Sequence, residues 1–201
     1  MANEWRKLAR TLMENLLQAT TSDEATRLID LATVKLRAQQ EALRSYRVGG
    51  AVGYVEPGPA GASPASLLED ARREIKRCSA LHFLADSGIP HCFEGMGFVL
   101  SAGALESWAG RSSEALQNGD EAQICLRNGV SFATAAIDAV GVAAAILPAS
   151  DILQRAWLLA AEQLQTKAID EVCLARDHLQ DMRGQICLQF IDAGIIVHLL
   201  D

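Results

Sequence analysis

The sequence predicts an all-α protein: a multi-helix bundle of about six to seven helices, with a Gly/Pro-rich loop after an N-terminal helical hairpin. Apolar residues recur every three or four positions through several segments, which is the period of one helix face. Half of the 201 residues are apolar but only 5% are aromatic, so the core must consist mainly of Ala, Leu, Ile and Val. Such side chains favour closely packed helices.

Residues 1–47 are predicted to form the helical hairpin. Its first helix runs from Asn3 to about Ala19, with apolar side chains on one face. Hydroxyl and acidic residues between Thr20 and Glu24 are typical of a helix start and open a second, antiparallel helix. Residues 48–66 are rich in glycine and proline and are predicted to be a loop or linker.

Residues 67–201 are predicted to be the main helical bundle, forming one domain with the hairpin. Its first helix starts at Pro64 with Ser66 and is expected to end near Ser87-Gly88, just before Pro90. The apolar segment Pro90 to Ala109 is expected to be a buried element.

Turn-forming residues predict the remaining boundaries. A turn at Asn118-Gly119-Asp120 precedes a helix over Glu121 to Leu147. Ser150 or Asp151 begins a long amphipathic helix, which Gly184 is expected to break or kink. The apolar tail from Ile186 to Leu200 fits either helix or strand.

The charge and the cysteines restrict the class of protein. A net charge of -7 and a pI near 5.1 argue against binding to nucleic acid, which needs a clustered positive surface, and make a membrane unlikely as a partner for the same reason. The first residues lack the apolar core of a secretory signal, and the five cysteines have no regular framework spacing. We therefore expect a cytoplasmic protein with reduced thiols.

One short stretch concentrates metal-binding side chains: Cys78, His82, His91, Cys92 and Glu94. Cys78 and His82 are four residues apart on a helix, and a turn at Gly88-Ile89-Pro90 would fold His91 and Cys92 back toward them. Thiolate and imidazole are ligands that zinc prefers. No cofactor is predicted outright, but zinc or iron would fit this set; ordinary packing of cysteine in a core explains the same residues.

The long helix carries a second acidic group. Asp170, Asp177 and Asp181 share a face with a spacing that would allow a divalent cation to bind, with Glu171 and His178 nearby. A solvated helix surface explains this pattern without any metal chemistry and is the favoured interpretation.

Ala133 to Leu147 consists almost wholly of small apolar residues, interrupted by Asp138. The segment is shorter than the roughly 20 residues that span a bilayer, which favours a helix of the protein core over a membrane span. Its small side chains would let a partner helix approach closely, so it is a candidate oligomer interface.

We therefore expect a helical protein-interaction module, such as an adaptor, chaperone, toxin-neutralising or regulatory subunit, without catalysis of its own. Its partner would be another protein or a second copy of the chain. An enzyme, small-ligand or metal-binding protein using the Cys78/His82/His91/Cys92 cluster is the alternative, and a membrane-inserting protein is a minor one. The sequence shows no catalytic frame such as Gly-x-Ser-x-Gly.

Overall fold

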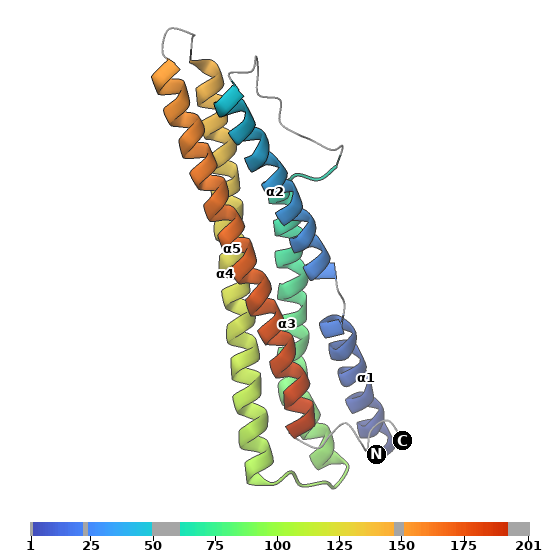
Figure 1. Ribbon diagram of the computed structural model, residues 1–201. Helices are drawn as coiled ribbons and strands as arrows, with labels where there is room; N and C mark the ends of the chain where they lie inside the picture. Colours follow the sequence, from blue (N-terminus) through green and yellow to red (C-terminus); the bar gives the residue numbers. More distant parts are fainter. Residues whose placement is uncertain (1, 22–23, 50–60, 147–150, 193–201) are drawn as a thin grey trace. The chain divides into compact units, whose positions relative to one another are not determined.

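The computed structural model describes residues 2–21, 24–49, 61–146 and 151–192, and this part of the chain is almost entirely helical (Figure 1). The described residues form five helices: α1 (Ala2–Thr21), α2 (Glu24–Gly49), α3 (Pro64–Gly95), α4 (Ala102–Ala145) and α5 (Asp151–Asp192). The all-α prediction is confirmed, but these helices are fewer and longer than the six to seven expected. Most of the predicted loop 48–66, the predicted end at Leu147 and the tail after Asp192 lie outside the described residues.

Three predicted helix boundaries are wrong. The helix expected to end near Ser87-Gly88 continues through Pro90 to Gly95, α4 runs without a turn through Asn118-Gly119-Asp120, and α5 passes Gly184 unbroken. A glycine inside a helix costs only about 1 kcal/mol relative to alanine. Continuous burial of the apolar stripe on either side of each site outweighs that local cost.

The long helices bury a heptad pattern. Their buried positions alternate in steps of three and four, which is the repeat that lets helices in a bundle stay in contact along their length. In α3 the series includes Leu68, Ala71, Ile75, Cys78, His82, Ala85, Ile89 and Cys92. In α5 it is Leu158, Ala161, Gln165, Ala168, Val172, Ala175, Leu179, Met182, Ile186 and Gln189.

Specific residues start α3 and α4 and end α3. Ser63 Oγ accepts a hydrogen bond from the Ser66 backbone N–H at 3.1 Å, and Ser101 Oγ caps α4 in the same way. At the end of α3, Gly97 has a φ of 84°, and the Phe98 N–H bonds to the Phe93 carbonyl at 2.9 Å. The Phe93 and Phe98 rings meet edge to face. This is a Schellman motif, in which glycine supplies the left-handed residue.

The described helices are divided between two compact units. The first unit contains α1, the second half of α3, the first half of α4 and the end of α5; its chain ranges are 1–24, 73–123 and 177–201. The second contains α2 and the other halves of the same three helices, in the ranges 25–72 and 124–176. The two helices of the predicted hairpin therefore belong to different units.

In the first unit, glycines allow close contact between helices. Added Cβ atoms at Gly88 and Gly95 of α3 would lie 2.8 Å from Leu12 Cδ1 and 2.6 Å from the Trp5 ring, so α1 lies directly on the backbone of α3. Gly119 of α4 has the same role, because its Cβ would lie 2.7 Å from Ser79 Oγ. Gly119 is therefore buried at a contact between α3 and α4, and α4 continues through it instead of turning.

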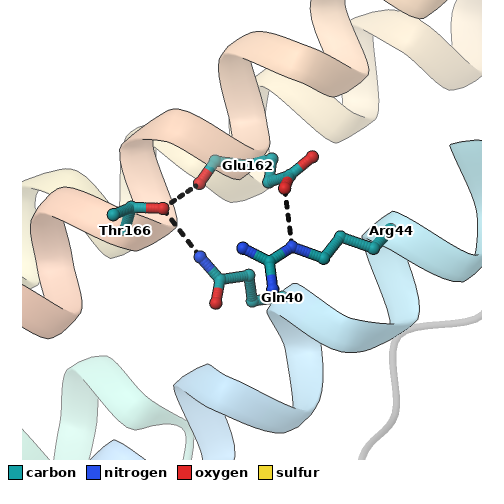
Figure 2. Close-up of polar contacts among 4 residues, drawn as sticks. All are labelled: Gln40, Arg44, Glu162 and Thr166. Atoms are coloured by element: carbon teal, nitrogen blue, oxygen red, sulfur yellow. Dashed lines mark hydrogen bonds and ion pairs between the residues drawn. The ribbon is translucent and has the colours of Figure 1, made fainter.

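In the second unit, α2 lies antiparallel to α5, and polar side chains join the two helices (Figure 2). Gln40 Nε2 donates to Thr166 Oγ1 at 2.7 Å, and Arg44 Nε donates to Glu162 Oε1 at 2.7 Å. The hydrogen bond to Glu162 raises the pKa of Arg44. The same unit contains an apolar cluster made of Leu43, Ala139, Ala143, Leu158 and Ala161.

The segment Pro90 to Ala109 is not the single buried element that was expected. It comprises the end of α3, a connection over residues 96–101 and the start of α4. Trp108 is buried, but Phe98 and Val99 are 56% and 91% exposed. The Schellman turn at Gly97 directs the chain outward here, so hydropathy alone overestimated burial.

Candidate functional site

The structure separates the five predicted metal ligands into two groups on α3. Cys78, His82 and Cys92 lie on the buried stripe of the helix. The side chains of His91 and Glu94 are each 68% exposed and face each other at 3.7 Å. The predicted fold-back at Gly88-Ile89-Pro90 is wrong, because an uninterrupted helix places residues 91 and 94 away from the stripe that holds 78, 82 and 92.

Burial determines the protonation of the inward-facing group. Desolvation raises the pKa of the Cys78 and Cys92 thiols, so both are held in the neutral S–H form. Desolvation also lowers the pKa of the His82 imidazole, with the hydrogen bond to Gln189 and the charge of Asp86 acting in the opposite direction. Neutral thiols are poor nucleophiles and poor metal ligands, whereas a neutral imidazole can still coordinate.

His82 belongs to a buried polar network in the first unit. Its Nε2 lies 2.7 Å from Gln189 Oε1, and since an amide oxygen only accepts, Nε2 carries the hydrogen and Nδ1 does not. His82 Nδ1 has no hydrogen-bond partner in the described part of the chain. Gln189 Nε2 in turn donates to Asp86 Oδ1 at 3.4 Å and to the Trp108 carbonyl at 3.3 Å.

Pro90 explains how Trp108 joins this network. A proline has no N–H, so the carbonyl four residues earlier, that of Asp86, loses its helical partner. Trp108 Nε1 donates to that carbonyl at 3.0 Å and to Asp86 Oδ1 at 2.9 Å. The indole therefore replaces the missing backbone donor and lets α3 continue through a residue that usually ends a helix.

The exposed pair has a different environment. The His91 ring meets Trp5 of α1 edge to face, with 5.3 Å between the ring centroids. Glu94 lies one turn further along α3, next to Gly95 where Trp5 packs. His91 therefore takes part in the contact between α1 and α3.

No group of three or more His, Cys, Asp or Glu side chains in the described residues has an arrangement that could hold a metal ion. The zinc or iron site remains a prediction that rests on the sequence pattern. The acidic group on α5 forms no such arrangement within the described residues either: Asp170, Asp177 and Asp181 are exposed, His178 bonds to Asn118, and Glu171 bonds to Asn128 of α4.

The second unit shows a different feature, an apolar surface that faces outward. Residues 128–145 of α4 contain one charged residue, Asp138, and the residues that they bury are Gly129, Ala133, Ala136, Ala139 and Ala143. Ile137 and Val142 remain 44% and 41% exposed. By length and composition, α4 is the one described helix apolar enough to cross a membrane. Only 28% of its apolar 18-residue stretch is buried.

The apolar composition of Ala133 to Leu147 was evident from the sequence, but the free side of the helix was not. The three- and four-residue steps between small residues were the signal available, since they separate an inner face from an outer one. No protein-family model, curated protein or solved structure matches this chain.

Proposed function

We propose that this chain is a helical protein-interaction module that acts as an adaptor, chaperone, toxin-neutralising or regulatory subunit and has no catalysis of its own. The observation that carries the proposal is the outward apolar face of α4: only 28% of the apolar 18-residue stretch of this helix is buried. Apolar surface left in water costs about 25 cal/mol per Å². A partner that covers this face recovers that free energy, which is why such surfaces mark interaction sites.

The state of the cysteines supports a reducing, cytoplasmic setting as part of this proposal. None of the five cysteines is in a disulfide, and Cys173 and Cys187 are exposed. Exposed thiols persist where glutathione and thioredoxin keep them reduced.

A pair of matched variants tests the interaction function. The wild-type chain is immobilised, exposed to extract of its own host and compared with Val142→Lys. The lysine should abolish capture of the specifically bound protein, because it places a charge within the apolar face. Val34→Lys is the control: Val34 is 63% exposed on α2 of the same unit, so this variant adds the same charge away from the face.

Both variants should keep the wild-type helical circular dichroism and melting temperature, since neither residue is buried. Capture that is equal for wild type, Val142→Lys and Val34→Lys would contradict the interaction proposal. Flotation of the chain with lipid vesicles, lost in Val142→Lys, would support the membrane-inserting alternative in its place.

The enzyme or ligand-binding alternative has one supporting observation, the buried His82 Nδ1 lone pair without a partner in the described part of the chain. Zinc or iron binding through Cys78 and His82 would be lost in His82→Gln, as measured by metal content after equilibrium dialysis. Equal metal content in wild type and His82→Gln would remove this alternative.

A further inference from the structure

The outer face of α4 in the second unit carries a regular stripe of exposed residues. We define the outer stripe as Ile124, Arg127, Ser131, Thr134, Asp138, Gly141 and Ala145, all of which are exposed. Successive members are separated by three or four residues in alternation, so the stripe follows a heptad repeat on a side of the helix away from its buried residues. A second helix could therefore lie along it for several turns.

The outer stripe has complementary residues at matching distances from its centre. Arg127 and Asp138 are equidistant from the point between Phe132 and Ala133. Ser131 and Thr134 are also equidistant from that point, and so are Ile124 and Gly141. The two residues of each pair are chemically complementary: the first pair is a cation and an anion, the second is two hydroxyl side chains, and the third is a large side chain and a glycine.

This symmetry matches an antiparallel copy of the same helix. A twofold axis between Phe132 and Ala133 brings Arg127 of each copy to Asp138 of the other, which forms two equivalent ion pairs. Each Ile124 then lies over Gly141, where an added Cβ would have no atom within 4 Å. A parallel pairing would instead place Arg127 against Arg127, which is repulsive.

Both charges are available for such contacts. Arg127 and Asp138 are exposed, and neither forms a side-chain hydrogen bond or ion pair with another residue in the described part of the chain. They are also the only charged residues of α4 between Ile124 and Ala145. Two opposite charges on an otherwise uncharged face define both the direction and the register of the partner helix.

We propose that two copies of this chain associate through α4, antiparallel, along the outer stripe and about a twofold axis between Phe132 and Ala133. The inference rests on the proposed interaction function and names a second copy as the partner of this face. The small side chains Ser131 and Thr134 at the centre allow the two helix axes to approach within the usual packing distance of about 8–10 Å.

Charge reversal tests the direction and the register together. Sedimentation velocity of the full chain over a dilution series should show a reversible dimer. Arg127→Asp sets two carboxylates against each other at both ends of the interface, and Asp138→Arg does the same with two guanidinium groups. Each single variant should raise the dimer dissociation constant at least about tenfold, because each turns two favourable pairs into repulsive ones.

An equimolar mixture of the two single variants provides the decisive measurement. In a heterodimer, the carboxylate introduced by Arg127→Asp meets the guanidinium introduced by Asp138→Arg at one end of the interface. The unchanged Asp138 of the first chain meets the unchanged Arg127 of the second at the other end, so association should return to near the wild-type level.

The double variant R127D/D138R should associate with itself for the same reason, since both pairs are exchanged without loss. Arg37→Asp and Asp170→Arg are the controls. Both residues are exposed on other helices of the same unit, and both changes should leave the dimer intact.

A wild-type chain that is monomeric throughout the series, or a dimer that is unaffected by the charge reversals, would overturn this inference. Repulsive single variants whose mixture fails to associate would overturn the antiparallel register. If the chain is monomeric but captures a different protein that Val142→Lys loses, the second-copy inference fails and the interaction function stands. If neither association occurs, both fail.

Discussion

Gln189→Leu tests the buried polar network of the first unit. Leucine fills a volume similar to that of glutamine but cannot accept the hydrogen from His82 Nε2, which lies 2.7 Å from Gln189 Oε1. A buried donor left without a partner costs about 1–3 kcal/mol. The 3.3 and 3.4 Å contacts of Gln189 Nε2 are longer and add less. We expect the free energy of unfolding to fall by about 2–3 kcal/mol.

Urea unfolding followed by circular dichroism measures this loss, with Gln180→Leu as the control on an exposed turn of α5. The double variant His82→Leu/Gln189→Leu removes the donor together with the acceptor. Its stability should return to within about 1 kcal/mol of wild type, because replacing both partners by apolar groups leaves no unsatisfied polar atom in this pair. Additive losses in the double variant, or a Gln189→Leu loss no larger than that of Gln180→Leu, would refute the role of the network.

Three further predictions concern the same unit. Burial lowers the pKa of His82 in the folded state, so unfolded chains bind more protons than folded ones as the pH falls through about 6.5. Stability should therefore decrease between about pH 7 and pH 5. Urea titrations should show a weaker decrease in His82→Gln. An equal pH dependence in both proteins would contradict this assignment. Gly97→Ala forces a Cβ into a φ of 84° and should cost about 1 kcal/mol in thermal unfolding, whereas Gly103→Ala, with open space around its Cβ, should not. Trp108→Phe should lower the stability of the wild-type chain by about 1–2 kcal/mol. The same change made in the Pro90→Ala variant should cost less, because alanine restores a backbone donor to the Asp86 carbonyl. Equal losses in both backgrounds would show that the indole does not replace that donor.

The candidate site was predictable only in part. The four-residue spacing of Cys78 and His82 places both on one face, and the structure buries both. Neither the partner of His82, which is 107 residues away, nor the exposure of His91 follows from the local pattern. Pro90 predicts a helix end because a proline usually leaves a carbonyl without a donor, and the donor supplied by Trp108 is a tertiary contact.

Local chemistry determined the helical class, the start of α3 at Pro64 and the beginning of α2 near Glu24. Residue spacing, capping hydroxyls and the fixed φ of proline all act over a few residues. Helix length was decided by tertiary structure. Gly88, Gly119 and Gly184 resemble boundaries in isolation, where glycine costs about 1 kcal/mol relative to alanine. In the folded chain, Gly88 and Gly119 are sites where another helix approaches the backbone. Gly184 is exposed, but the buried stripe of α5 continues past it from Met182 to Ile186, and burial of such stripes exceeds the cost of the glycine. The sequence alone lacks this information, because the contacts come from residues far apart along the chain.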